Sequence, residues 1–110
     1  MEPKIRQGYL YDFYGELLNE HQKEIFEAYV LEDLSLKEIA DDQGISRQGV
    51  SDLIHRCTNS LEEYENKLHL IEKFMSIKDK VDDIITLTDS GSKESLSKIR
   101  VISDAILEEL

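Results

Sequence analysis

Residues 34–54, LSLKEIADDQGISRQGVSDLI, constrain the fold more than any other stretch of the sequence. Apolar residues recur at three- and four-residue spacing on both sides of Gly44, which is typical of two short helices. Glycine adopts the left-handed backbone conformation that ends a helix tightly, because it has no Cβ. The stretch therefore predicts two helices joined by a turn of about three residues.

Local signals also predict where both of these helices begin. Ser35 and Glu38 have the spacing of a capping box, in which each side chain bonds a free backbone N–H group of the other. Ser46 is a second N-cap, and Ile45 and Val50 are spaced as the hydrophobic staple around it. Together with the glycine turn, these signals predict a helix-turn-helix.

The two helices of a helix-turn-helix have different tasks, because the first braces the second and the second enters a major groove. The residues predicted to brace are apolar, namely Ile39, Ala40, Ile45, Val50 and Leu53. The residues predicted to face outward and bind nucleic acid are Ser46, Arg47, Gln48, Ser51, Asp52, His55 and Arg56. Arginine can pair with guanine or a phosphate, and glutamine can pair with adenine.

The remainder of the chain also has helical spacing. One helix is expected over residues 4–18, and Asn19 is expected to cap a second that buries Ile25, Phe26, Tyr29 and Val30. A long helix is expected over about residues 61–87, then the loop TDSGSKES and a last helix over 92–109. With one proline and five glycines in 110 residues, the sequence predicts an all-α fold of five to six helices.

We expect a single helical domain over residues 1–110, with the helix-turn-helix core at 19–60 and a C-terminal helical extension at 61–110. The long helix of the extension has two apolar stripes, which implies two neighbours. Both stripes can pack inside the domain. Alternatively, the chain forms a homodimer through a seam made of Tyr64, Leu68, Ile71 and Met75.

The formal net charge of −11 argues against loose attachment to polyanions. Residues 1–60 hold six Lys and Arg against twelve Asp and Glu, and residues 61–110 hold seven against twelve. Residues 46–58 hold two arginines and one aspartate, which is a weak phosphate clamp. Two hypotheses follow: a regulatory protein that binds DNA, and an acidic adapter that binds a basic protein or an RNA complex.

The sequence offers no pattern expected of an enzyme or a membrane protein. His21, His55 and His69 fall on separate predicted helices, and no residues have the spacing of a catalytic triad, a metal site or a phosphate-binding loop. We therefore expect no catalysis, metal or cofactor. No apolar run is long enough to span a bilayer and Cys57 is the single cysteine, so a cytoplasmic location is expected.

Residues 34–54 resemble the helix-turn-helix of region 4 in sigma factors, although Gln43 stands where those modules usually have leucine. Together with the preceding LLNEHQKEIFEAYVLED and the chain length, they resemble the YlxM family of small bacterial proteins over most of the chain. The resemblance implies a sigma region 4-like helix-turn-helix followed by a long helix and a C-terminal helix, in a bacterial cytoplasm. It also implies genes beside those of the signal recognition particle, and a regulatory role with that particle's protein or RNA as partner.

Overall fold

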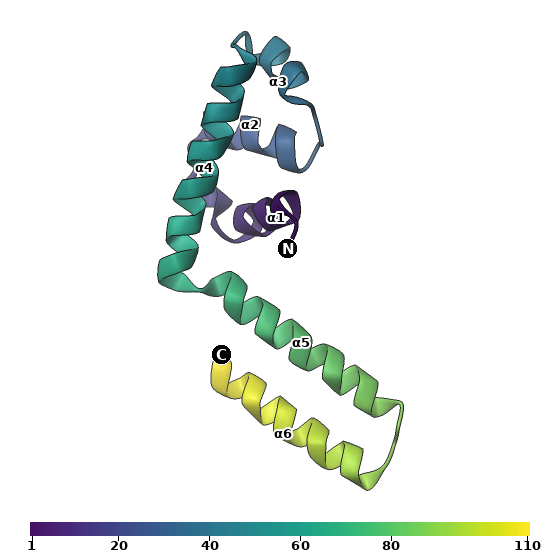
Figure 1. The fold of residues 1–110 in the computed structure, drawn as a ribbon. Coiled ribbons are helices and arrows are strands. Elements are labelled where there is room, and N and C mark those ends of the chain that lie inside the picture. The colour runs from purple at the N-terminus through teal and green to yellow at the C-terminus, as the bar shows by residue number, and fades with distance from the viewer. The chain divides into compact units, whose positions relative to one another are not determined.

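A computed structural model describes residues 1–110, which form six α-helices and no strand (Figure 1). The prediction of an all-α fold with five to six helices is confirmed. The chain divides into two compact units, Met1–His69 and Leu70–Leu110. None of the helices combines the length and the apolar content that crossing a membrane requires.

The first unit is built on one long helix, α4 (Arg47–Leu68). Three shorter helices pack against it, namely α1 (Pro3–Tyr14), α2 (Glu20–Val30) and α3 (Leu36–Gln43), and Figure 1 shows them in succession along α4. A 3-10 turn, η1 (Gly15–Leu17), follows α1. The apolar side chains buried in this unit are Leu10, Tyr14, Leu18, Ile25, Phe26, Ile39, Ala40, Val50, Ile54, Cys57 and Leu61.

Capping boxes start α2 and α3 where the sequence predicted them. Asn19 Oδ1 accepts a hydrogen bond of 2.8 Å from the Gln22 backbone, and Gln22 Oε1 accepts one of 3.0 Å from the Asn19 backbone. The same exchange joins Ser35 and Glu38 at 3.0 and 3.1 Å. Both predicted helix starts are therefore confirmed.

The first helix is shorter than the predicted 4–18, because α1 ends at Tyr14 and the chain continues as a 3-10 turn. Gly15 stands at this transition, and glycine is a poor helix former. A Cβ at Gly15 would lie 2.7 Å from ring carbons of Tyr11. The Tyr11 ring stacks on Phe26 with centroids 5.7 Å apart, and its hydroxyl donates to Glu27. Glycine therefore leaves room for a ring that joins α1 to α2.

Burial along α2 follows the prediction only in part. Ile25 and Phe26 are fully buried, whereas Tyr29 and Val30 are half-buried. Lys4 Nζ lies 4.5 Å from the centroid of the Tyr29 ring, which is a cation–π contact between α1 and α2.

The predicted long helix over 61–87 is wrong, because the helix break lies at His69. Residues 58–60, Thr-Asn-Ser, are weak helix formers but remain inside α4. Thr58 Oγ1 donates 2.8 Å back to the Ile54 carbonyl, which keeps this side chain compatible with the helix. The buried stripe is continuous across the segment and consists of Val50, Ile54, Cys57 and Leu61. Packing of this stripe outweighs the local preference.

The second unit is an antiparallel hairpin of α5 (Leu70–Thr88) and α6 (Lys93–Glu109) (Figure 1). Gly91 takes a φ of 62° in the connection, inside the predicted loop TDSGSKES. Ser92 caps α6, because its Oγ accepts a hydrogen bond of 3.0 Å from the Ser95 backbone. At the open end, Glu109 Oε1 accepts from Lys80 Nζ at 2.6 Å and from Ser76 Oγ at 2.7 Å. The predicted last helix over 92–109 is confirmed within one residue.

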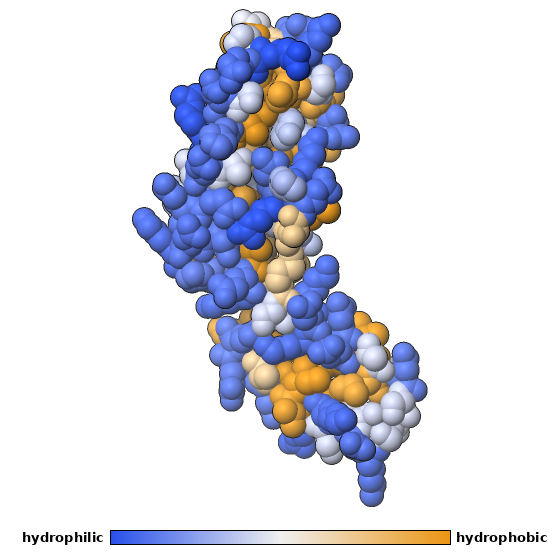
Figure 2. All heavy atoms as spheres, in the orientation of Figure 1, coloured by the Kyte–Doolittle hydropathy of each residue, from blue (hydrophilic) through white to orange (hydrophobic).

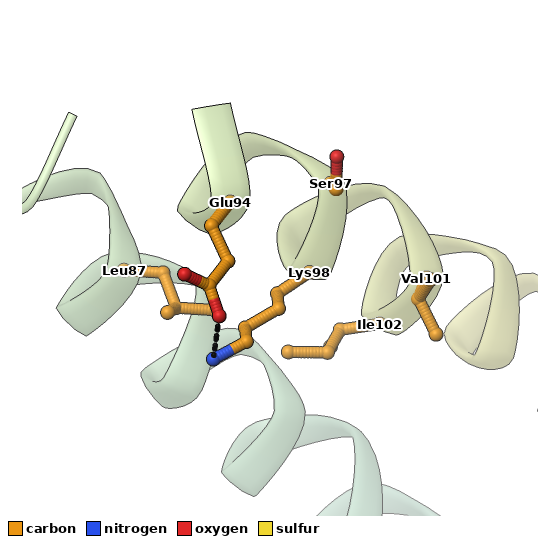
Figure 3. A pocket seen from close by; sticks show the side chains of 6 residues that line it. All are labelled: Leu87, Glu94, Ser97, Lys98, Val101 and Ile102. Atoms are coloured by element: carbon orange, nitrogen blue, oxygen red, sulfur yellow. Dashed lines mark ion pairs between the residues drawn. The ribbon is translucent and has the colours of Figure 1, made fainter. Parts of the chain in front are cut away.

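The hairpin buries little of its apolar surface, and Figure 2 shows apolar atoms at its surface. A hollow of about 350 Å³ lies along α6 and α5 (Figure 3). Glu94 and Lys98 form an ion pair of 3.4 Å at its rim. The other side chains that line the hollow are Leu87, Ser97, Val101 and Ile102.

Candidate nucleic-acid interface

The turn between α3 and α4 has the geometry that the sequence predicted. Gly44 follows the last residue of α3 with φ 68° and ψ 31°, in the left-handed region. The backbone N–H of Ile45 donates to the Ala40 carbonyl at 3.1 Å, which satisfies a carbonyl at the helix end. A Cβ at Gly44 would meet no atom within 4 Å. The requirement for glycine here therefore comes from the backbone angle alone.

Ser46 begins α4 as predicted. Its Oγ accepts a hydrogen bond of 2.9 Å from the Gly49 backbone N–H. Gly49 thus lies in the first turn of the helix, and a Cβ at this position would lie 3.1 Å from Ser46 Oγ. The glycine permits a close approach between the cap hydroxyl and the helix backbone.

Three of the five predicted bracing residues of the helix-turn-helix are buried. Ile39, Ala40 and Val50 are buried, and Leu53 is half-buried. Ile45 differs from the prediction, because 41% of it is exposed. It lies in the turn, outside both helices, with its Cδ1 beside the first turn of α4. The burial that holds α4 against α3 therefore comes from the helices themselves.

The predicted nucleic-acid-binding residues lie on the first half of α4 and at its cap. Ser51 is half-buried, and the exposed members are Ser46, Arg47, Gln48, Asp52, His55 and Arg56. The structure brings three of the seven together at one hollow, which is lined by Arg47, Gln48, Ser51 and, from α3, Leu36. The volume of this hollow is about 340 Å³. His55 and Arg56 lie further along α4 and do not line it.

The prediction gave Leu36 no role. It is the first residue of α3, directly after the Ser35 cap, and it is half-buried. Its position three residues before the buried Ile39 was the available signal, since residues three apart lie on one helix face. Leu36 adds an apolar surface beside the polar groups of α4, and apolar side chains can contact the methyl group of thymine.

Asp52 is hydrogen-bonded to another of the predicted nucleic-acid-binding residues, because its Oδ1 accepts a hydrogen bond of 2.8 Å from Gln48 Nε2. The two residues are four apart on α4, so they lie on the same face. Residues 1–69 hold seven Lys and Arg against fifteen Asp and Glu, a formal charge of −8. The surface therefore offers directed hydrogen-bonding groups and two arginines within a negatively charged unit.

The predicted dimer seam is not continuous. Tyr64 and Leu68 are exposed near the C-terminal end of α4, whereas Ile71 and Met75 belong to α5. Ile71 is also buried. The four residues do not share a helix, because the chain turns at His69 with φ 57°.

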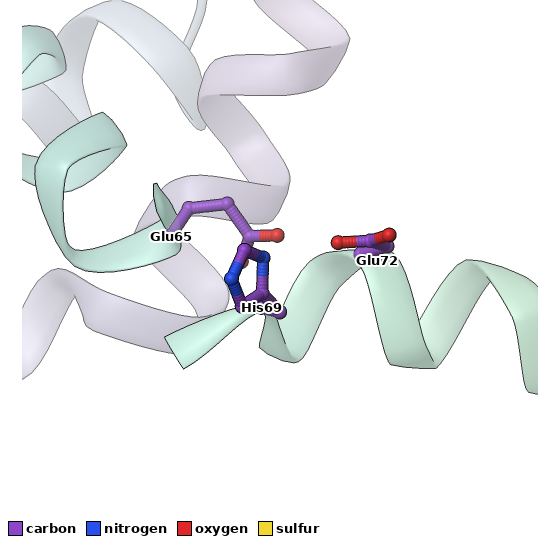
Figure 4. A group of neighbouring side chains, drawn as sticks. All are labelled: Glu65, His69 and Glu72. Atoms are coloured by element: carbon purple, nitrogen blue, oxygen red, sulfur yellow. The ribbon is translucent and has the colours of Figure 1, made fainter. Parts of the chain in front are cut away.

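Two histidines that the sequence predicted on separate helices belong to α4. His55 and His69, expected on separate helices, are an internal residue and the C-terminal cap of the same helix. Figure 4 shows Glu65 near the end of α4 and His69, which follows the last residue of that helix. Glu65 is buried and accepts a hydrogen bond of 2.6 Å from the Tyr14 hydroxyl. We therefore assign its carboxylate to the packing of α1 on α4.

A glycine turn between a short bracing helix and a longer helix with an exposed polar start defines a helix-turn-helix protein. The comparison with protein families agrees with this class. A family described as "Putative helix-turn-helix protein, YlxM / p13 like" matches residues 1–102. The chain belongs to this family, as its resemblance predicted.

Individual relatives extend over nearly the same length. The chain is 45% identical over 94 residues to the UPF0122 protein YlxM of Bacillus subtilis, covering 86% of this chain and 84% of the relative. It is 43% identical over 104 residues to a UPF0122 protein of Clostridium kluyveri, covering 91% and 94%. It is 40% identical over 104 residues to one of Symbiobacterium thermophilum, covering 91% and 97%.

Proposed function

We propose that this protein is a regulatory helix-turn-helix protein that binds duplex DNA through the first half of α4. The observation that carries the proposal is the hollow where Arg47, Gln48 and Ser51 of α4 meet Leu36 of α3. Arginine and glutamine can each form two hydrogen bonds with a base edge in the major groove. A leucine beside them supplies the apolar contact that thymine can use.

The position of these groups on the helix supports the same function. Arg47 and Gln48 lie in the first turn of α4, and the N-terminal residues of a recognition helix are those that reach base edges. Gln48, Asp52 and Arg56 are spaced four residues apart along α4, so Arg56 continues the stripe that carries Gln48. Its position about two turns further along the helix suits a phosphate contact at the edge of the groove.

The negative charge of the protein limits how it can bind. Each phosphate neutralised by a cation releases counterions, so that the logarithm of the affinity falls with the logarithm of salt by about 0.9 per contact. Arg47 and Arg56 are the two cations of the proposed surface on α4. We therefore expect a shallow slope of about −2 and modest affinity at physiological salt.

The test is titration of fluorescently labelled duplex DNA at low and moderate salt, followed by anisotropy. Arg47→Ala should weaken binding by about five- to a hundredfold. Arg56→Ala should weaken binding to all duplexes alike and reduce the salt slope by about 1. Lys67→Ala is the matched control, because it removes a cation from the exposed last turn of α4. The proposal fails if the protein binds no duplex at low salt, or if the two arginine variants bind like the control.

A second candidate rests on α2. A hollow of about 450 Å³ on this helix is lined by Glu20, His21, Lys23, Glu24 and Glu27. Such a surface suits a basic protein, including the signal recognition particle partner that the family resemblance implies. Glu20→Gln with Glu24→Gln should then weaken capture of that basic protein by the purified chain. Unchanged capture would remove this candidate.

A further inference from the structure

The hydrogen bond between Gln48 and Asp52 orients a side chain on the proposed DNA-binding surface. A glutamine amide can turn either its NH₂ group or its oxygen toward a neighbour. An ionised carboxylate only accepts hydrogen bonds, so it admits only the NH₂ orientation. Gln48 Nε2 accordingly donates to Asp52 Oδ1 at 2.8 Å, and both residues are exposed on α4. The Gln48 amide oxygen is thereby turned away from Asp52.

The orientation matters because bases differ in the groups that they present in the major groove. Adenine presents the N6 amino donor and the N7 acceptor, and a glutamine pairs with both through its oxygen and one N–H. The amide has two N–H groups, and only the one on the same side as the oxygen takes part in the pair with adenine, so the proposed role requires Asp52 to accept from the other. Guanine presents two acceptors, which would face the Gln48 oxygen unfavourably.

We infer that Asp52 is a positioning residue that sets the Gln48 amide to select adenine, so that this pair determines one base of the DNA site. The inference rests on the proposed binding of duplex DNA. It also explains why an acidic residue, Asp52, lies on a surface proposed to face the phosphates of DNA. The carboxylate lowers affinity for every DNA through repulsion, and in exchange it fixes the donor and acceptor that discriminate between bases.

If Asp52 has this role, its carboxylate lowers the affinity for DNA in general but raises the selectivity for adenine. Asp52→Asn removes the charge but keeps the shape, and an asparagine can donate or accept, so Gln48 can adopt both orientations. We expect the variant to bind duplexes without adenine at that position about two- to fivefold more tightly. Its preference for adenine at one position should fall about threefold or more, since a well-placed bidentate contact is worth about five- to a hundredfold.

Three further variants make the test specific. Asp52→Glu keeps an acceptor-only group four residues from Gln48, and should retain the adenine preference. Asp41→Asn removes an exposed charge from α3 and leaves the hydrogen bond between Gln48 and Asp52 in place, so it should leave the base preference unchanged. Gln48→Ala should abolish the adenine preference at the same position. Each protein's thermal unfolding midpoint is measured alongside, to establish that it is folded.

The experiment is binding to a pool of duplexes with randomised base pairs, followed by sequencing of the bound fraction. The inference is supported if wild type selects adenine at one position and Asp52→Asn, unlike Asp41→Asn, loses that selection. It is overturned if wild type binds DNA without base preference, or if the two variants have the same preference. Absence of any duplex binding by wild type would overturn the proposed function and this inference together.

Discussion

Arg6 and Glu62 join α1 to α4 through two parallel hydrogen bonds. Arg6 Nε donates to Glu62 Oε1 at 2.7 Å, and Arg6 Nη2 donates to Oε2 at 2.9 Å. The hydrogen bond with Glu62 raises the pKa of the Arg6 guanidinium. A two-bonded pair of this kind fixes direction as well as distance, so it helps to set how α1 lies on the helix that carries the candidate interface.

Arg6→Lys should weaken this connection, because an ammonium group cannot form both bonds with the same geometry. We expect a loss of about 1 kcal/mol in the free energy of unfolding, since the pair is partly exposed to water. Urea denaturation followed by circular dichroism measures it. Arg100→Lys, on the exposed surface of α6, is the control and should change stability little. Equal effects of the two substitutions would contradict the prediction.

Gly44→Ala should destabilise the first unit by about 1 to 2 kcal/mol, because alanine is strained at a φ of 68°. The cost is one of backbone conformation, since a Cβ there meets no atom. Gly8→Ala should have the opposite effect on the free energy of unfolding. Gly8 lies inside α1, where a Cβ would make an ordinary contact of 3.8 Å with Val30, so alanine should stabilise by about 0.5 to 1 kcal/mol. Thermal unfolding of the two variants should therefore shift in opposite directions.

The sequence predicted best those features that depend on neighbouring residues. Ser35 with Glu38, Ser46 and Gly44 are recognisable because caps and left-handed turns are local in their chemistry. The end of α4 was not predictable in this way. Residues 58–60 have the composition of a helix end, yet the packing of Cys57 and Leu61 keeps α4 continuous through them.

The candidate site was predictable in its residue types and only partly in its arrangement. Exposure of Arg47 and Gln48 follows from helical periodicity. The four-residue spacing of Gln48 and Asp52 permits their hydrogen bond, but the sequence analysis did not predict it. The spacing of Leu36 from Ile39 indicates only that both lie on one face of α3. Its place beside Arg47 and Gln48 depends on how α3 packs on α4, which that spacing does not specify.

The hairpin should lose stability in acid. Lys80 and Ser76 hold the pKa of Glu109 below its ordinary value of 4.5. A lowered pKa in the folded state means that the stabilisation is complete above pH 4.5 and is lost as the pH falls through the folded value. The protection factors of the α5 and α6 amides in hydrogen exchange, which are corrected for the intrinsic pH dependence of exchange, should therefore fall below about pH 4.5. Glu109→Gln should remove this dependence, and Glu108→Gln should retain it.

Cys57 should react slowly with thiol reagents in the folded protein. Its side chain is buried, and burial raises the pKa of the thiol, so the reactive thiolate is scarce. A chromogenic disulfide reagent added to native protein should modify it at the rate at which the first unit opens. Denaturant should increase the rate by orders of magnitude. Rapid labelling of the native protein would contradict this arrangement.

The uninterrupted course of α4 has a mechanical consequence. Its 22 residues form a rod of about 33 Å, with Arg47 at one end and Leu68 at the other. No joint separates the end that carries the polar recognition groups from the end at which the chain leaves the unit. A rotation of α4 imposed at Leu68 is therefore transmitted along the whole helix to Arg47.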